Sequence, residues 1–271
     1  MNASQQQALR AASNSCVTLV QGPPGTGKTT CAVRILKSWS NSDGGWRDKA
    51  KDGILATSDS NIAVDNLVEG LATEGVKVVR LGRPETTRPE LLRHCVDEIA
   101  RGNLGYKTAK DVPKEGKERE NYTAEIIKVT RNAQVVCCTA VGAGSGLLER
   151  HVFSRVLIDE ASQATELATI IPFCRGSRQV VLCGDHCQLP PTVSSERAKE
   201  EGAELSLFER LVRDAGVKPH LLQIQYRMHP VISDFPRRNF YAGRLEDGID
   251  GSTRPAPLGF PWPDPSRPVA F

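Results

Sequence analysis

The sequence has no long hydrophobic run, because none of its apolar stretches approaches the ~20 residues that a helix needs to cross a bilayer. Its first residues, Met1 to Arg10, are polar and rich in glutamine, so we expect no secretory h-region there. Aromatic side chains make up only 5%, and a formal net charge of +3 is too small to indicate nucleic-acid binding by itself. These features exclude a membrane-spanning helix and leave the function open.

The eight cysteines include no C-x-x-C pair, and Cys183 and Cys187 have no second thiol pair or histidine pair with which to form a zinc site. Five cysteines lie in apolar runs, where a free thiol behaves as a small hydrophobic side chain. These five are Cys16, Cys31, Cys137, Cys138 and Cys183. We therefore expect reduced, buried thiols, which are typical of a cytoplasmic or nuclear protein.

Short apolar runs alternate with helical patterns along the chain, and several runs are apolar on both faces, as at residues 156–158. Strands that helices cover on both sides have this composition, so the sequence predicts an α/β fold with a mostly parallel, doubly wound sheet. A further helix is expected at 204–215, where apolar residues form one stripe and Gly216 follows. The expected strands are 16–21, 53–57, 77–81, 134–139, 155–159, 179–183 and 220–224.

Two segments interrupt this alternation. Residues 83–131 predict a helical insertion, with a helix at 89–101 and a mobile tip at 107–120 that is rich in Lys, Glu and Gly. The mixed charges of the insertion predict a solvated surface and not a dedicated nucleic-acid arm. Residues 251–271 contain six prolines and predict a linker, with the first step of a new strand at 268–271. The expected main domain is therefore 1–250.

The strongest motif is a complete G-x-x-x-x-G-K-T at residues 22–29, after the apolar run 17–20 and before a helical stretch at 30–39. Its glycines let backbone amides converge on an anion, and the helix N-terminus adds partial positive charge. Lys28 would hold the β- and γ-phosphates, and Thr29 would place its hydroxyl on Mg²⁺. The expected nucleotide-binding residues here are Gly22, Pro23, Pro24, Gly25, Thr26, Gly27, Lys28, Thr29 and Thr30. The segment predicts a nucleoside triphosphate site.

Three further polar groups follow strands of the predicted sheet. Asp159 and Glu160 end the strand at 155–159, where Asp159 can orient the Mg²⁺ waters and Glu160 can polarise the attacking water. Gln188 can reach the γ-phosphate as a sensor, and Arg227 can also face the phosphates. Adjacent acids, or a single Gln or Arg, are also common on surfaces, but ligands of open α/β sheets bind at the carboxyl ends of the strands. Together these groups favour catalysis of hydrolysis.

On these segments the chain resembles the superfamily 1 helicases of the up-frameshift, or nonsense-mediated decay, type. The segments that carry the resemblance are 2–5, 21–29, 60–65, 136–144, 158–163, 184–190 and 225–230, in the order of the family. It implies a RecA-like P-loop NTPase domain, in which ATP and Mg²⁺ bind, with Thr29 and Asp159 at the metal. It further implies that Gln5 reads the adenine edge and Tyr226 stacks on the base.

The same resemblance implies 5′ to 3′ movement on single-stranded RNA or DNA, with the strand touching Ser60, Asn61, Thr139 and Val141. The family's second RecA-like domain, which carries an arginine finger, has no counterpart in this sequence. We therefore expect the first motor half of a helicase, with slow ATP hydrolysis by the chain alone. A nucleotide-dependent clamp on a strand or partner, without useful turnover, is the alternative. A GTPase switch would need an Asn-Lys-x-Asp segment, and none is present.

Overall fold

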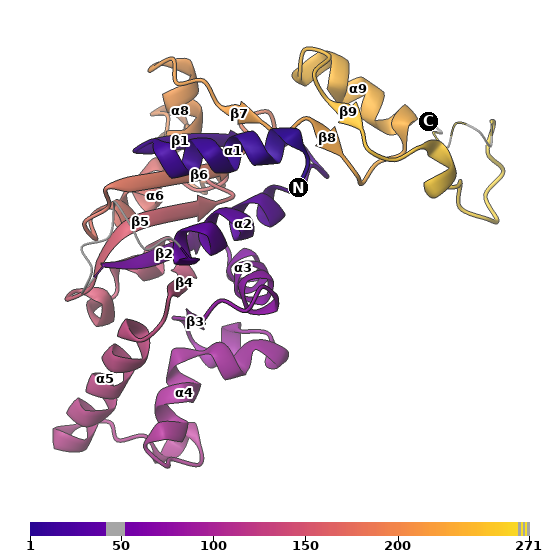
Figure 1. The fold of residues 1–271 in the computed structure, drawn as a ribbon. Coiled ribbons are helices and arrows are strands. Elements are labelled where there is room, and N and C mark those ends of the chain that lie inside the picture. The colour runs from indigo at the N-terminus through magenta and orange to yellow at the C-terminus, as the bar shows by residue number, and fades with distance from the viewer. Residues whose placement is uncertain (42–51, 265–266, 268, 270–271) are drawn as a thin grey trace.

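A seven-stranded sheet, in which every strand runs parallel to its neighbours, forms the centre of the computed structural model, which describes residues 1–41, 52–264, 267 and 269 (Figure 1). The strand order is β3-β4-β2-β5-β6-β1-β7. The strands are β1 Val17–Gln21, β2 Asp52–Ser58, β3 Val78–Arg80, β4 Val135–Thr139, β5 Val152–Asp159, β6 Gln179–Gly184 and β7 His220–Leu221. The predicted α/β class and the mostly parallel, doubly wound sheet are confirmed.

Helices cover both faces of this sheet, which explains why its strands are apolar on both sides. Neighbouring residues of one strand belong to different cores: Cys137 and Leu157 pack into one, Cys138 and Ile158 into the other. The helices of the first face are α1 Ala3–Asn14, α2 Lys28–Asn41 and α3 Asn61–Thr73. Those that contribute to the second are α4 Val96–Asn103, α5 Gly116–Arg131, α6 Glu166–Phe173 and α8 Leu207–Arg213. No helix of the described part is long and apolar enough to span a membrane.

The insertion is helical, as predicted, but its elements differ. The expected helix at 89–101 is a 3₁₀ segment, Pro89–His94, followed by α4, because Cys95 adopts an extended backbone and forms a bridge to Arg80. The expected mobile tip at 107–120 is wrong in its second part, since α5 starts at Gly116. Tyr122 and Ile126 of α5 are buried, and this burial holds the charged segment as a helix.

The predicted strand at 220–224 is wrong as one element. β7 pairs with β1, whereas β8, Ile224–Gln225, pairs with β9, Glu246–Asp247, in a separate two-stranded sheet. The break occurs at Gln223, whose backbone N–H donates to Ser4 Oγ at 3.2 Å instead of to the main sheet. β8, β9 and α9, Pro230–Phe240, therefore lie beside the main body (Figure 1).

Three smaller predictions concern the cysteines, the helix at 204–215 and the linker. Cys16 is exposed just before β1, so its predicted burial is wrong, although Cys31, Cys137, Cys138 and Cys183 are buried and all eight thiols are free. The helix expected at 204–215 is shorter, because Ser206 caps the N-terminus of α8. In the predicted linker, residues 254–264 form no helix or strand. Residues 265–266, 268 and 270–271, and with them most of the expected strand start, lie outside the described residues.

A buried ion pair joins the insertion to the sheet. Arg80 of β3 and Asp65 of α3 are 1% and 2% exposed, and Arg80 Nε donates to Asp65 Oδ1 at 2.6 Å. Arg80 Nη2 also donates to Asn61 Oδ1 and to the carbonyl of Thr86, while the Arg88 N–H donates to Asp65 Oδ2 at 2.9 Å. The opposite charges of Arg80 and Asp65 are thus paired, and four hydrogen bonds surround them at the base of the insertion.

Removing one partner of this pair is therefore expected to be strongly destabilising. Asp65→Ala leaves the Arg80 guanidinium buried without a countercharge, which costs about 3–5 kcal/mol in the free energy of unfolding. Urea denaturation measures this loss. The control is Glu201→Ala, which removes the exposed Arg197–Glu201 pair and is expected to cost about 0–1 kcal/mol. Equal losses in the two variants would show that the buried pair contributes no more than a surface pair.

Candidate nucleotide-binding site

The carboxyl ends of β1, β5 and β6 lie side by side, because these three strands are neighbours in a parallel sheet. A cleft of about 380 Å³ opens there. Its lining combines residues from four strand ends: Pro23, Pro24, Gly25, Gly27, Lys28, Thr29, Thr30, Glu160, Gln188, Tyr226 and Arg227. Of the predicted nucleotide and catalytic residues, Gln5, Gly22, Thr26 and Asp159 do not line it.

The phosphate loop has the backbone that its glycines permit. Gly25 and Gly27 have φ of 78° and 77°, values that residues with a Cβ rarely adopt. A Cβ on Gly25 would lie 2.5 Å from Cβ of Arg227, and the Tyr226 N–H donates to the Gly25 carbonyl at 2.9 Å. The loop after β1 and the turn after β8 are therefore in direct contact at Gly25.

Two contacts join Asp159 and Glu160 to residues of the phosphate loop. Thr29 Oγ1 donates to Asp159 Oδ2 at 3.0 Å, and Lys28 Nζ lies 3.2 Å from Glu160 Oε2. Burial and, second, the charge of Glu160 raise the pKa of Asp159 to about 6. Carboxylate and hydroxyl oxygens are ligands that suit Mg²⁺, so Thr29 and Asp159 have the chemistry and the proximity to hold that ion.

Glu160 has an unusual backbone for its position. Its φ is 54°, in the left-handed region, which costs a residue with a Cβ on the order of 1–3 kcal/mol. Its N–H donates to Asp159 Oδ1 at 3.1 Å, and its Oε2 accepts from Gln163 Nε2 at 3.2 Å. The surrounding contacts hold Glu160 in the conformation that directs its carboxylate to Lys28 and the cleft.

Gln188 is held by a residue that the sequence analysis did not select. Gln188 Nε2 donates to Asp185 Oδ2 at 2.5 Å, and Asp185 is fully buried. Asp185 also accepts from Gln21 Nε2 at 3.0 Å and from the Tyr241 hydroxyl at 2.7 Å. The signal in the sequence was an acid at the end of a strand, as at Asp159. Asp185 therefore orients the predicted γ-phosphate sensor and does not line the cleft.

Gln5 lies behind the phosphate loop. Its side chain is buried, with Nε2 donating to the Thr26 carbonyl at 3.1 Å and Oε1 accepting from the Asn2 N–H at 3.1 Å. Tyr226 does line the cleft; it is 42% exposed and its hydroxyl accepts from Asn2 Nδ2 at 3.2 Å. The roles of Gln5 at the adenine edge and of Tyr226 in stacking stay predictions.

The four residues predicted to touch a nucleic-acid strand follow β2 and β4 at the same edge of the sheet. These strands are paired at Ser58 and Thr139, which brings Ser60 and Asn61 close to Thr139 and Val141. Three of the four use a side-chain oxygen internally: Ser60 Oγ accepts from Ala63 N, Asn61 Oδ1 from Arg80, and Thr139 Oγ1 from Gly142 N. Val141 is 64% exposed. Each of these three oxygens therefore already accepts one hydrogen bond within the chain.

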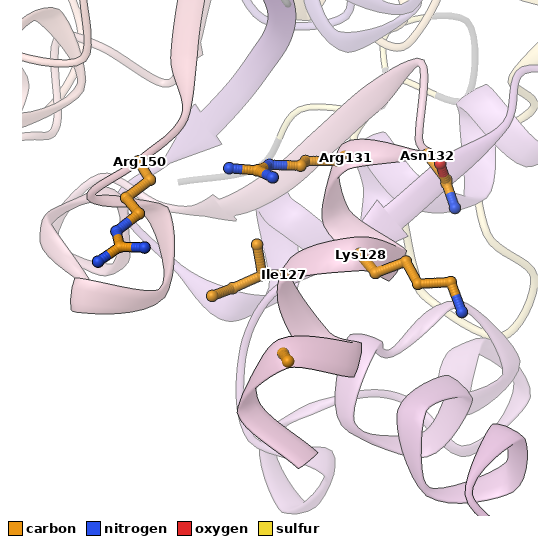
Figure 2. Close-up of a pocket in the computed structure, with 6 residues that line it drawn as sticks. Ile127, Lys128, Arg131, Asn132 and Arg150 are labelled. Carbon is orange, nitrogen blue, oxygen red and sulfur yellow. The ribbon is translucent and has the colours of Figure 1, made fainter. Parts of the chain in front are cut away.

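A second hollow, of about 310 Å³, lies between α5 and the turn before β5 (Figure 2). Arg131 and Arg150 flank Ile127 there, whereas Lys128 points away and pairs with Glu125 at 3.0 Å. It lies where β4 and β5 begin, at the opposite edge from the nucleotide cleft, and no predicted site residue lines it. An adjoining hollow, of about 380 Å³, is lined by acids and bases alike: Arg119 and Glu120 of α5, and Glu149 and Arg150 before β5.

The whole chain is similar to known proteins. A family model described as an AAA domain matches residues 1–128 and 106–196, and a second model with the same description matches residues 203–271. The chain is 39% identical to "Regulator of nonsense transcripts 1 homolog" of Arabidopsis thaliana and 38% identical to that of Drosophila melanogaster. It is also 38% identical to "ATP-dependent helicase NAM7" of Saccharomyces cerevisiae.

Each of these three alignments covers 100% of this chain but only 22%, 24% and 28% of the relatives, so the chain spans about a quarter of their length. The first family model alone matches more than half of the chain. The chain therefore belongs to the AAA domain family, and its similarity to the regulators of nonsense transcripts confirms the resemblance to superfamily 1 helicases of the up-frameshift type.

Proposed function

We propose that this chain is the first motor half of an ATP-dependent helicase, which hydrolyses ATP to move 5′ to 3′ along single-stranded RNA or DNA. The observation that carries the proposal is one sheet edge that holds a phosphate loop, the Asp159–Thr29 and Glu160–Lys28 contacts, and the strand-contact residues. The similarity to the yeast relative, an ATP-dependent helicase by name, supports it. A second RecA-like domain, outside this sequence, would complete the motor.

The proposal assigns roles to seven side chains at this site. Lys28 and Arg227 bind the phosphates, and Gln188 senses the γ-phosphate. Mg²⁺, held by Thr29 and Asp159, would neutralise phosphate charge. Glu160 accepts the proton of the water that attacks the γ-phosphate, and Tyr226 stacks on the base.

The contact between Lys28 and Glu160 has a consequence for this reaction. Phosphate oxygens compete with the Glu160 carboxylate for the Lys28 ammonium, because both are anionic and Lys28 is only partly exposed. When Lys28 turns to the phosphates, Glu160 loses its cationic partner and its carboxylate becomes available to the attacking water. Nucleotide binding and activation of the base are thus linked through one lysine.

The partners in this proposal are a single strand of RNA or DNA and the second domain. We further propose a cytoplasmic or nuclear location, because free thiols persist in reducing compartments and all eight cysteines are unpaired. The strand would lie along the edge formed by Ser60, Asn61, Thr139 and Val141. Since the side-chain oxygens of Ser60, Asn61 and Thr139 already accept internal hydrogen bonds, binding would depend mainly on the phosphate backbone.

The function is tested by phosphate release from Mg-ATP, measured with and without poly-uridine or oligo-deoxythymidine. We expect the chain alone to bind ATP and to release phosphate slowly, because the arginine finger of the proposed second domain is not supplied. Glu160→Gln is expected to lower the rate by about 10²–10⁴-fold while ATP binding is kept, since only the base is lost. Lys28→Ala serves as the control that loses binding.

Unchanged turnover in Glu160→Gln would contradict the role of Glu160 as the base. Fast, strand-stimulated release by the monomeric chain would contradict the assignment as a motor half. Tight strand binding that depends on a non-hydrolysable ATP analogue, with no turnover, would instead support the clamp.

Strand binding is expected to be weak and to fall as salt is added, because it depends on phosphate contacts. Val141→Asp places a negative charge at the proposed strand edge and should weaken oligo-deoxythymidine binding about fivefold, equal to about 1 kcal/mol. Fluorescence anisotropy at several salt concentrations measures both effects. Val17→Asp is the matched control, because Val17 is exposed at the amino end of β1, away from that edge. Equal losses in both variants would argue against this strand path.

A further inference from the structure

One buried side chain, Gln225, holds the turn that carries Tyr226 and Arg227. Gln225 Oε1 accepts from the backbone N–H groups of Arg227 and Met228 at 2.8 and 2.7 Å, and Nε2 donates to the Met228 carbonyl at 2.8 Å. The fourth hydrogen bond runs from Nε2 to Asp247 Oδ1 at 2.7 Å. All four hydrogen-bonding positions of the amide are used, so the turn is closed around Gln225.

Asp247 fixes Gln225 in turn. It lies beside Gln225 in the parallel register of β8 and β9, and it accepts from Ser233 Oγ and from Arg237 Nη2, both on α9. Burial opposes ionisation of Asp247, but the hydrogen bonds from Ser233 and Gln225 and the Arg237 charge lower its pKa below the ordinary value. Asp247 is therefore a carboxylate whose partners join α9, β8 and the turn.

Gly248, the next residue, leaves space for the Tyr226 ring. A Cβ on Gly248 would clash with Cε1 of Tyr226 and would lie 2.6 Å from Cδ1 of the same ring. It would also lie 2.7 Å from Cγ2 of Ile224. The Gly248 N–H donates to the Gln225 carbonyl at 2.8 Å, so the backbone there cannot withdraw without losing a hydrogen bond. At its other end the ring is held through its hydroxyl by Asn2.

We propose that Asp247 and Gly248 are positioning residues of the nucleotide site. Asp247 acts through Gln225 to hold the turn that sets Arg227 against Gly25 of the phosphate loop. Gly248 provides the space in which the Tyr226 ring lies for base stacking. This inference rests on the proposed roles of Tyr226 and Arg227. It assigns the two residues separable effects: Asp247 supports the whole turn and thus phosphate binding, whereas Gly248 affects base binding alone.

The test compares two ligands by calorimetry on the whole chain: Mg-ATP and magnesium tripolyphosphate, which has the phosphates without the base. Gly248→Ala should weaken ATP binding about tenfold, the scale of one base–aromatic stack, and leave tripolyphosphate within about twofold. Asp247→Ala should weaken both ligands about tenfold, because the whole turn loses its support. Asp247→Asn keeps an acceptor for Gln225 and should recover most of that loss.

Matched controls separate positioning from general destabilisation. Gly102→Ala adds a methyl group where nothing lies within 4 Å, and Asp234→Asn removes the partner of Arg238 on α9. Both should bind both ligands like the parent chain. In a Tyr226→Ala background, Gly248→Ala should have no further effect, since the ring it displaces is gone. Thermal unfolding verifies that every variant is folded.

Gly248→Ala that binds ATP like the parent, or that weakens both ligands equally, overturns the role of Gly248. Asp247→Ala with unchanged binding of both ligands overturns the role of Asp247, provided that Arg227→Ala weakens tripolyphosphate. If Tyr226→Ala and Arg227→Ala change neither affinity, the proposed nucleotide roles themselves fail, and their positioning fails with them.

Discussion

Burial of a parallel sheet on both faces is the constraint on which the rest of this structure depends. Its strands are therefore largely apolar on both sides, and most of the polar side chains of the nucleotide cleft lie where the strands end. Parallel strands end at one edge, and that edge here carries the phosphate loop, Asp159, Glu160 and Asp185. The same packing that forms the two cores therefore concentrates the polar chemistry in one place.

Within that edge, the charges are arranged before any ligand is considered. Lys28 faces Glu160, and Asp159 accepts from Thr29. The left-handed backbone of Glu160 and the burial of Asp159 are both unfavourable locally, and the surrounding fold maintains them. Groups that are held in position need little reorganisation when charge develops in a transition state. Glu160 and Asp159 thus lower the local stability of this edge, and in return their carboxylates have a fixed geometry.

The nucleotide cleft is built from two pieces of backbone that are far apart in the sequence. The phosphate loop belongs to the main sheet, whereas the Tyr226–Arg227 turn belongs to the unit of β8, β9 and α9. They meet at Gly25, where only a glycine leaves enough room for Arg227. Two separate hydrogen-bond networks therefore support the cleft: one around Asp185 holds Gln188, and one around Gln225 and Asp247 holds the turn of Tyr226 and Arg227.

The sequence by itself determined the main sheet, the phosphate loop and the two acids at the end of β5, because runs that are apolar on both faces and the spacing of glycines are local properties. Only the tertiary structure decided the contacts between distant residues. The apolar run at 220–224 is split because Ser4 takes the N–H of Gln223, and Cys95 is extended because it pairs with Arg80. Likewise, Asp65 meets Arg80, and Asp247 meets Gln225, across separations with no local signature. Such partners are selected by packing in three dimensions, which no short stretch of sequence records.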